Sequence, residues 1–288
     1  MKLLSFGEVL WDLFGDAAHI GGAPLNLAAH FVRQGGEAAL LSAVGRDALG
    51  KRTREAVGAL SVDTSLLTVE PSLPTGSCTV TVDAAGAPHY ALADPAAYDR
   101  IGAPPLALCA DAIAFGTLAL RHPHNREILG RILAEGHFGE IYTDLNVRPP
   151  FSGADAIRFC LGAATVAKMS DEELPAVTEA ALGHPAACEE AARALASRYP
   201  QLRILLITEG ERGALAYLPG EDALLRTPAY PASVASTVGA GDSFGAAFLY
   251  AYLSGRGIPD CLRIAARVSA LVVSAVEAVP EYRIEDLI

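Results

Sequence analysis

Short apolar runs alternate along most of the chain with longer segments whose apolar residues recur every three or four positions. The runs have the length of buried strands, and the longer segments have the period of helices with one buried face. This alternation is typical of a largely parallel sheet covered by helices. The predicted strands are Lys2 to Val9, Ala38 to Val44, Ala112 to Gly116, Glu140 to Asn146, Thr165 to Met169, Arg203 to Thr208 and Gly213 to Leu218. The predicted helices lie near Pro24 to Gln34, Asp47 to Leu60, Pro123 to Glu135, Asp171 to Ala181, Pro185 to Tyr199, Asp242 to Ser254 and Pro259 to Ala278.

The segment from Ser77 to Leu92 departs from this rhythm. Two strand-like runs, Thr79 to Val82 and His89 to Leu92, flank the sequence Asp83-Ala84-Ala85-Gly86, which is typical of a hairpin turn. The chain contains no internal repeat and no linker long enough to separate two domains. We therefore expect one α/β domain over residues 1–288 with a small β appendage.

Composition excludes several classes of protein. Of the 288 residues 51% are apolar and 19% charged, so disorder is not the main state. The formal net charge of −11, with no basic run, argues against a nucleic-acid partner. No apolar stretch reaches the roughly 18 residues of a membrane span, and Glu8 interrupts the first apolar run before it could serve as a signal peptide. We expect a cytoplasmic protein that does not bind membranes, with its five cysteines reduced.

The segment from Ser236 to Gly245 carries the densest motif, and it admits three readings. As a dinucleotide fingerprint it fails, because Gly245 follows Gly241 one residue too late for G-x-G-x-x-G. As a serine hydrolase elbow, Gly241 to Gly245 matches G-x-S-x-G, but no histidine follows Ser243 to complete a triad.

The third reading is an anion site with an acid at its rim. Glycines at 239 and 241 allow backbone N–H groups to point at one position, and the helix that follows adds its positive end. Asp242 in the first helical turn is then placed to accept a proton from an attacking hydroxyl. The structural alternative is a glycine turn in which Asp242 only favours the helix start.

A second glycine motif resembles a phosphate-binding P-loop but lacks one of the residues that a P-loop requires. The segment Gly45 to Lys51 matches G-x-x-x-x-G-K, but Arg52 stands where a phosphate-binding P-loop requires Ser or Thr. We interpret this segment as a turn and the start of a surface helix.

Four ordered blocks together resemble the ribokinase family of sugar kinases, also called the phosphofructokinase B family. Gly21 to Ala28 followed by Ala43 to Gly50 is similar to the family's first signature, in the Ala-Pro form of its fructokinase-like branch. Thr237 to Asp242 is similar to the second signature. Asp144 to Pro150 and Ile207 to Gly213 resemble two blocks that lie between them. The resemblance covers the whole chain and implies a ribokinase-like α/β fold with a small β-sheet lid, drawn from about residues 10–23 and 73–100.

The resemblance also assigns roles at the reacting end of the site. It implies that Asp242 is the catalytic base and that the amides of Gly239, Ala240 and Gly241 form the anion hole. It places the sugar-binding groups at Asp12, Gly22, Asn26 and Arg148. These residue types suit the task, because Asp and Asn pair with hydroxyls and a guanidinium pairs with oxyanions.

The lid and the nucleotide side complete the implied site. The hairpin would close over the sugar and exclude water, and it often pairs with a second subunit in this family, so we expect a homodimer. Tyr90 and Tyr98 are candidate walls of the sugar site. The expected ATP-binding residues are Lys168, Ser170, Thr208, Gly210 and Gly213.

Two departures from the family pattern bear on cations. Ser236 replaces an aspartate that helps hold the family's monovalent-cation loop, so the resemblance does not carry potassium activation over to this chain. Ser170 replaces the asparagine of an N-x-x-E motif, while Glu173 remains. We expect Mg²⁺ to be used through Glu173 and water, although Ser170 and Glu173 also have the spacing of a capping box.

The sequence therefore predicts an ATP-dependent sugar kinase that acts on a small sugar, most simply D-fructose at O6. A 2-keto-3-deoxygluconate kinase or a ribokinase-type activity is the alternative within the class. A catalytically idle sugar-binding relative is the alternative outside it, against which the intact Asp242 argues.

Overall fold

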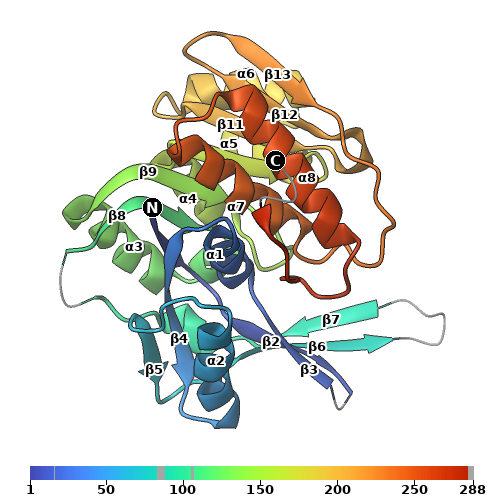
Figure 1. Ribbon diagram of the computed structural model, residues 1–288. Coiled ribbons are helices and arrows are strands. Elements are labelled where there is room, and N and C mark those ends of the chain that lie inside the picture. Colours follow the sequence, from blue (N-terminus) through green and yellow to red (C-terminus); the bar gives the residue numbers. More distant parts are fainter. Residues whose placement is uncertain (16, 83–87, 105–106, 285–288) are drawn as a thin grey trace.

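A nine-stranded sheet forms the body of the computed structural model, which describes residues 1–15, 17–82, 88–104 and 107–284 (Figure 1). Its order is β13-β12-β11-β10-β9-β8-β1-β4-β5. The seven strands from β11 to β5 run parallel, and β12 and β13 are added antiparallel at one edge. Its strands are β1 (Lys2–Phe6), β4 (Glu37–Gly45), β5 (Leu67–Glu70), β8 (Cys109–Phe115), β9 (His137–Asp144), β10 (Val166–Ser170), β11 (Ile204–Thr208), β12 (Ala214–Leu218) and β13 (Ala223–Thr227).

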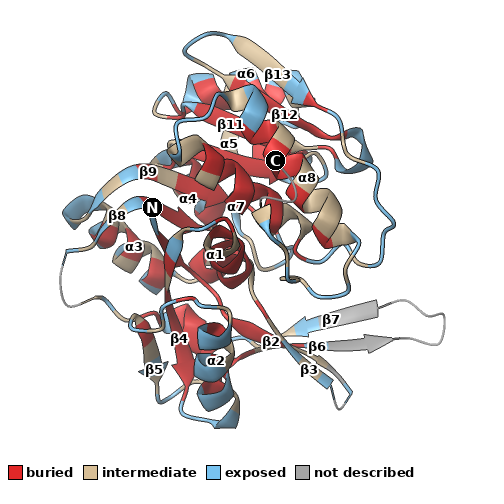
Figure 2. Ribbon diagram, viewed as in Figure 1, coloured by how far each residue is buried: buried red, intermediate tan, exposed pale blue. Residues whose placement is uncertain are grey.

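Helices cover both faces of this sheet, as a parallel sheet requires. One face is covered by α1 (Ala23–Arg33), α2 (Ala48–Ala59), α7 (Ala240–Leu253) and α8 (Ile258–Val273). The other is covered by α3 (Pro123–Glu135), α4 (Ala154–Ala163), α5 (Leu174–Leu182) and α6 (Cys188–Arg198). Each face has its own apolar core, and α7 is buried along most of its length (Figure 2). Among the described residues, no helix is long and apolar enough to cross a membrane.

A separate four-stranded sheet projects from the body, with the order β3-β2-β6-β7 (Figure 1). It comprises β2 (Leu10–Phe14), β3 (Ala17–Gly21), β6 (Gly76–Val82) and β7 (Pro88–Leu92). The hairpin expected between Ser77 and Leu92 is present as the antiparallel pair β6 and β7. Its expected turn, residues 83–86, lies outside the described residues.

Several predicted elements have different limits in the structure. The strand predicted over Lys2 to Val9 ends at Phe6, and the chain then continues into β2 of the small sheet. The helix predicted to reach Ala278 ends at Val273. The sequence prediction contained no counterpart of α4, β5 or β13.

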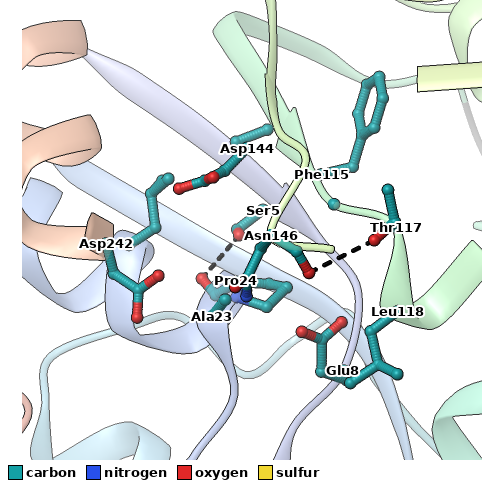
Figure 3. A pocket seen from close by; sticks show the side chains of 13 residues that line it. Ser5, Glu8, Ala23, Pro24, Phe115, Thr117, Leu118, Asp144, Asn146 and Asp242 are labelled. Carbon is teal, nitrogen blue, oxygen red and sulfur yellow. Dashed lines mark hydrogen bonds between the residues drawn. The ribbon is translucent and has the colours of Figure 1, made fainter. Parts of the chain in front are cut away.

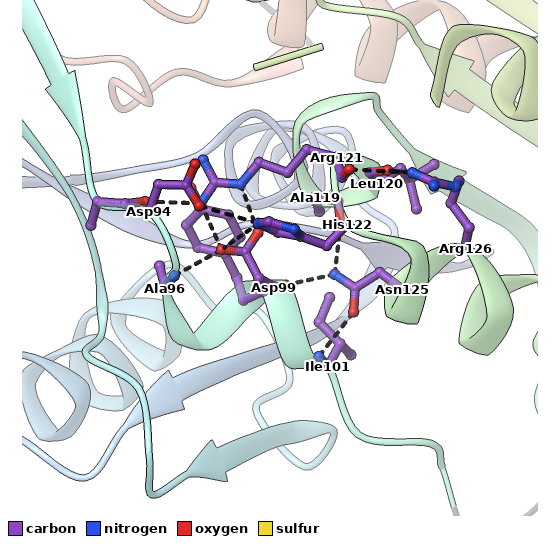
Figure 4. A network of polar contacts seen from close by, with 12 residues as sticks. Asp94, Ala96, Asp99, Ile101, Ala119, Leu120, Arg121, His122, Asn125 and Arg126 are labelled. Carbon is purple, nitrogen blue, oxygen red and sulfur yellow. Dashed lines mark hydrogen bonds and ion pairs between the residues drawn. The ribbon is translucent and has the colours of Figure 1, made fainter. Parts of the chain in front are cut away.

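A polar network joins the segment that follows β7 of the small sheet to the residues just before α3 in the body (Figure 4). The Arg121 guanidinium donates to both oxygens of Asp99, at 2.8 and 2.6 Å, and to the Ala93 carbonyl at 2.8 Å. Asp99, Asp94 and His122 bring three potential metal-binding atoms within 4.8 Å of one another. Because the Asp99 carboxylate already accepts from Arg121 and from the Ala96 amide, this cluster is an ion-pair network.

A second network ties the segment after α8 to helix α1. The Gln34 side-chain amide donates to the Tyr282 hydroxyl (3.0 Å), which lies 3.0 Å from Nδ1 of His30. Nε2 of His30 lies 2.9 Å from the Ala278 carbonyl. A carbonyl can only accept, so Nε2 carries the proton and Nδ1 accepts from Tyr282. Each of the three hydrogen bonds from Gln34 through Tyr282 and His30 to Ala278 therefore has a donor and an acceptor when the imidazole of His30 is neutral.

The buried His30 predicts a pH-dependent contribution to stability. Burial is the main cause that lowers the pKa of His30 to about 4, from 6.5. The unfolded chain binds the proton more readily, so this contribution is complete above pH 6.5 and is lost as the pH falls toward 4. We expect the difference in unfolding free energy between wild type and His30→Gln to shrink by about 3 kcal/mol from pH 7 to pH 4.

Urea unfolding at several pH values measures this difference. His184→Gln, which replaces an exposed histidine, is the control. If the difference in unfolding free energy between wild type and His30→Gln stays constant across this pH range, the assignment of a neutral buried His30 is contradicted.

Candidate active site

Most of the polar residues that the sequence analysis singled out lie at the carboxyl ends of the parallel strands. Parallel strands place their carboxyl ends at one edge, which is where open α/β sheets bind ligands. The helices α1 and α7 also begin near this edge and pack against each other. The residues that meet there lie in the last residues of β9 (Asp144), β10 (Lys168 to Ser170) and β11 (Thr208), or just after β1 (Glu8), β8 (Thr117) and β9 (Asn146 to Arg148).

The first turn of α7 has the geometry of an anion site. Gly239 is the N-cap residue with φ of 82°, and a Cβ there would lie 2.4 Å from the Ala278 carbonyl oxygen, so both conformation and space require glycine. The Ala240 amide donates to the Thr237 carbonyl at 3.3 Å. The amides of Gly239 and Gly241 have no acceptor within the described parts of the chain. Of the three amides expected in the anion hole, two are thus free and that of Ala240 is engaged.

Asp242 in this turn is joined to α1. The Asn26 side-chain amide donates to Oδ2 of Asp242 at 2.8 Å, across 216 positions of sequence. Burial and the negative charge of Asp144 raise the pKa of Asp242 to about 6. The bond from Asn26 and the positive charges of Lys168 and Arg148 oppose this rise. Asp242 is therefore an acid that changes its protonation state near neutral pH.

Lys168 lies beneath the anion turn rather than at its surface. Its Nζ donates to Oδ2 of Asp144 at 2.7 Å, and the two side chains are only 5% and 8% exposed. Burial lowers the pKa of Lys168, but the charges of Asp144, Glu173 and Asp242 outweigh it and raise the pKa above its usual value. A Cβ on Gly241 would lie 3.1 Å from Nζ. Lys168, expected among the ATP-binding residues, thus lies in this structure as a buried charge under the anion turn.

Glu173 bridges two strand ends. Its carboxylate oxygens accept from the amides of Val147 (2.5 Å) and Ser170 (2.6 Å), while the Glu173 amide donates to the Ser170 hydroxyl at 3.2 Å. This reciprocal pair is the capping box that the spacing predicted, although α5 begins only at Leu174. Burial and the charge of Asp144 raise the pKa of Glu173. The residue thus holds the segment after β9 against the end of β10.

The expected sugar-binding residues come from three elements. Asp12 lies on β2 opposite His19 of β3, and burial raises its pKa. Gly22 is the N-cap of α1 with φ of 113°, and a Cβ there would lie 2.6 Å from the Glu8 carbonyl oxygen. Arg148 is exposed after β9, and its charge lowers the pKa of Asp242. The small sheet therefore contributes Asp12, the start of α1 contributes Gly22 and Asn26, and the loop after β9 contributes Arg148.

Of the two candidate tyrosines, the structure describes the surroundings of Tyr98 and only the backbone position of Tyr90. Tyr98 is fully buried, with its ring against Gly76 and beneath the Arg121 guanidinium, 5.1 Å from ring centroid to Cζ. Tyr98, expected as a wall of the sugar site, lies in the apolar core at the root of the small sheet. Tyr90 lies on β7 opposite Val80, and its side chain is outside the described part of the structure.

The expected nucleotide-side residues lie at the ends of β10 and β11 and in the turn that follows β11. Ser170 pairs with Thr208 in the sheet register, and the Asp171 amide donates to the Thr208 carbonyl at 2.9 Å. Gly210 and Gly213 both have positive φ, in the short turn that leads to β12. The Ser236 hydroxyl accepts from the Val238 amide at 3.2 Å, a contact within the loop that enters α7.

A small cavity opens beside Asp242 (Figure 3). Its free space is about 10 Å³, close to that needed for one water molecule. Glu8, Thr117, Asp144 and Asn146 also line it, and none of the four was predicted as a site residue. The available signal was positional: each is a polar residue that ends a buried strand or lies two residues after one.

The buried pair of Lys168 and Asp144 predicts a large cost for removing one partner. Lys168→Met leaves the Asp144 carboxylate buried and unpaired, so we expect a loss of about 3–5 kcal/mol of unfolding free energy. Adding Asp144→Asn removes the stranded charge and is expected to restore much of the loss. Urea unfolding of both single variants and the double variant measures this coupling; a loss below about 1 kcal/mol for Lys168→Met would contradict it.

The chain is similar in sequence to known sugar kinases. A fructokinase from Klebsiella pneumoniae is 29% identical over 279 residues, covering 91% of this chain and 87% of that protein. A 5-dehydro-2-deoxygluconokinase from Bacillus licheniformis is 30% identical over 184 residues, covering 60% of this chain and 54% of that protein.

Solved structures share the fold. A fructokinase from Vibrio cholerae O395, in its fructose, ADP and calcium ion bound form, has a TM-score of 0.82 at 22% identity, over 96% of this chain and 94% of that one. An aminoimidazole riboside kinase from Salmonella enterica has a TM-score of 0.81 at 21% identity, over 100% and 98%. These likenesses show a ribokinase-like fold, as the sequence predicted. The model of the pfkB family of carbohydrate kinases matches residues 7–282, so this chain belongs to that family.

Proposed function

We propose that this sugar kinase is a fructokinase, which transfers the γ-phosphoryl group of ATP to O6 of D-fructose. The observation that carries the proposal is the hydrogen bond between Asn26 and Asp242, which brings a hydroxyl-binding amide and an acid into one site. The match to the Klebsiella pneumoniae fructokinase along most of both chains supports fructose as the acceptor.

In the proposed mechanism Asp242 accepts the proton of the attacking hydroxyl. Its pKa of about 6 leaves it mostly ionised at neutral pH, yet basic enough to take a proton as the new bond forms. Asn26 holds the carboxylate in one orientation, and Asp12 and Gly22 line the path of the sugar from the small sheet and α1. Positioning of this kind supplies much of the catalysis in phosphoryl transfer.

The transferring phosphoryl group would meet the start of α7. The free amides of Gly239 and Gly241 and the positive end of the helix stabilise negative charge there. Arg148 is an exposed guanidinium whose charge reaches the same region. The segment formed by Ser170, Thr208, Gly210 and Gly213 is the proposed nucleotide side.

Mg²⁺ would fit the carboxylates near this end of the sheet. Glu173 and Asp144 influence each other's charge, and Oδ1 of Asp144 has no hydrogen-bond partner within the described residues. Mg²⁺ prefers carboxylate oxygens and keeps several waters, so these residues would hold it largely through water. When bound, the ion neutralises charge on the phosphates.

A sugar-acid kinase is the second candidate function. The relatives named 5-dehydro-2-deoxygluconokinase favour it, although they match only part of this chain. Exposed Arg148 is the cation near Asp242 that could pair with a carboxylate.

We also propose that the small sheet closes over the sugar as a lid and pairs with the lid of a second copy, because its strands project from the body (Figure 1).

Sugar-dependent ADP release with Mg-ATP tests this function. The panel contains fructose, ribose, tagatose, glucose and 2-keto-3-deoxygluconate, each with and without potassium. We expect fructose to give the highest kcat/KM and Asp242→Asn to lower kcat by about 10²–10⁴-fold with a small change in sugar binding.

Asp260→Asn is the matched control, because Asp260 is likewise the third residue of its helix but lies on the surface. Its kcat is expected to equal that of wild type. Preference for 2-keto-3-deoxygluconate would establish the second candidate. A chain that binds a sugar without forming ADP would establish the idle relative instead.

The pKa of Asp242 predicts the acid limb of the pH profile. Because the ionised form is the base, kcat/KM is expected to rise from pH 5 to 7 with an apparent pKa near 6. Asn26→Ala removes a hydrogen bond that lowers this pKa, so the limb should move to higher pH. Initial rates in buffers of constant ionic strength measure both profiles, and an unmoved limb in Asn26→Ala would show that another group controls it.

A further inference from the structure

We propose that Glu8 is a specificity-determining residue whose Oε2 forms a hydrogen bond with a second, non-reacting hydroxyl of the acceptor sugar. The inference rests on the proposed sugar kinase function and adds a contact to the same site. It assigns a role to the acidic residue that follows β1, at the edge where Asp242 also lies.

The first observation is an unsatisfied buried carboxylate. Glu8 is 3% exposed, and its Oε2 has no hydrogen-bond partner within the described residues. The backbone amides of Glu8 itself and of Ala119 lower the pKa of the carboxyl group but leave Oε2 without a partner. A buried polar atom without a partner costs free energy, so such an atom in a native protein calls for an explanation. A ligand that supplies the missing hydrogen bond explains it.

The second observation is where the carboxylate lies. Glu8 lines the small cavity together with Asp242, Asn146 and Thr117. In the view of Figure 3 the carboxylates of Glu8 and Asp242 lie on either side of Ala23 and Pro24, the first residues of α1. The two acids influence each other's charge, which also places them in one region. In the proposed arrangement, a sugar whose reacting hydroxyl meets Asp242 would place a second hydroxyl at the part of the cavity that Glu8 lines.

The third observation is the chemistry of the group. Burial, with the charge of Asp242, raises the pKa of Glu8 to about 7, so both protonation states are present at neutral pH. A hydroxyl both donates and accepts, and so it pairs with the carboxylate and with the carboxylic acid. The free space of about 10 Å³ admits one oxygen atom with its hydrogen. A hydroxyl of the sugar and a single buried water molecule are the two sources of that chemistry.

Other occupants fit less well. Ala23, Pro24, Leu27, Phe115 and Leu118 make the remaining lining largely apolar. The charge of Arg148 lowers the pKa of Glu8, but Arg148 is exposed and forms no ion pair with Glu8 in the described structure. The surroundings therefore leave Oε2 to a small polar ligand group.

A double-mutant cycle between the protein and the sugar tests the contact. Wild type, Glu8→Leu and Glu8→Gln are assayed with fructose and with deoxyfructoses that each lack one non-reacting hydroxyl. We expect one deoxyfructose to lose about 10–100-fold in kcat/KM on wild type. Glu8→Leu should show a similar loss with fructose itself and should no longer distinguish fructose from that derivative. Glu8→Gln, whose amide still forms a hydrogen bond, should retain part of the preference.

Two outcomes would overturn the proposal. If Glu8→Leu lowers kcat/KM by the same factor for every sugar, the partner of Oε2 is a buried water and Glu8 has no role in specificity. If Glu8→Leu leaves all rates unchanged, the contact does not exist. Should Glu8→Leu fail to fold, the cycle is carried out with Glu8→Gln, for which we expect a selective loss of about three- to tenfold.

Glu140→Leu is the matched control, since it removes a carboxylate that is 9% exposed and pairs with Arg203 and Thr165. It is expected to lower stability without changing the preference among sugars. The failure of the proposed function has a different signature, namely no sugar-dependent ADP release by wild type. In that case calorimetric Kd values replace kcat/KM in the same cycle, and a wild type that binds none of these sugars would reject the Glu8 contact as well.

Discussion

The ion pair between Lys168 and Asp144 holds together a site that would otherwise concentrate negative charge. Parallel strands end at one edge, and the segments there bring Glu8, Asp144, Glu173 and Asp242 into electrostatic contact. Burial of like charges disfavours their ionised forms. Lys168 is buried beside Asp144 and also acts on Asp242 and Glu173. This arrangement keeps the pKa of Asp242 near 6, where the carboxylate is both available and basic.

Helix α1 connects the two halves of the site. Asn26 binds Asp242, and one turn later His30 binds the Ala278 carbonyl, against which Gly239 packs without room for a Cβ. Residues four apart in a helix share a face, so the two contacts come from the same side of α1. Asp242 and the turn at Gly239 are therefore braced by a single helix, which holds the start of α7 in a fixed position.

The body of the fold was largely readable from the sequence because its elements depend on local patterns. Buried strands such as β10 and β11 are continuous apolar runs, and α3 begins at a proline and ends before a glycine. Two of the missed elements have weak local signals. β5 and β13 lie at the two edges of the sheet, where fewer positions are buried and the apolar pattern is weaker. The segment after α8 has helical composition, but Ala278 is held by His30 instead.

The sequence by itself determined the α/β class, the family and the anion turn with Asp242, because these depend on periodicity and on residues close together in the chain. Only the tertiary structure decided which distant groups meet: Asn26 with Asp242, Lys168 with Asp144, and Glu8 with the cavity. Burial was likewise invisible in the sequence: no local pattern indicated that Tyr98 and Lys168, both candidate site residues, are buried. The physical reason is that solvation and charge at a strand end are set by every element that packs there, whereas a local pattern reports only its own element.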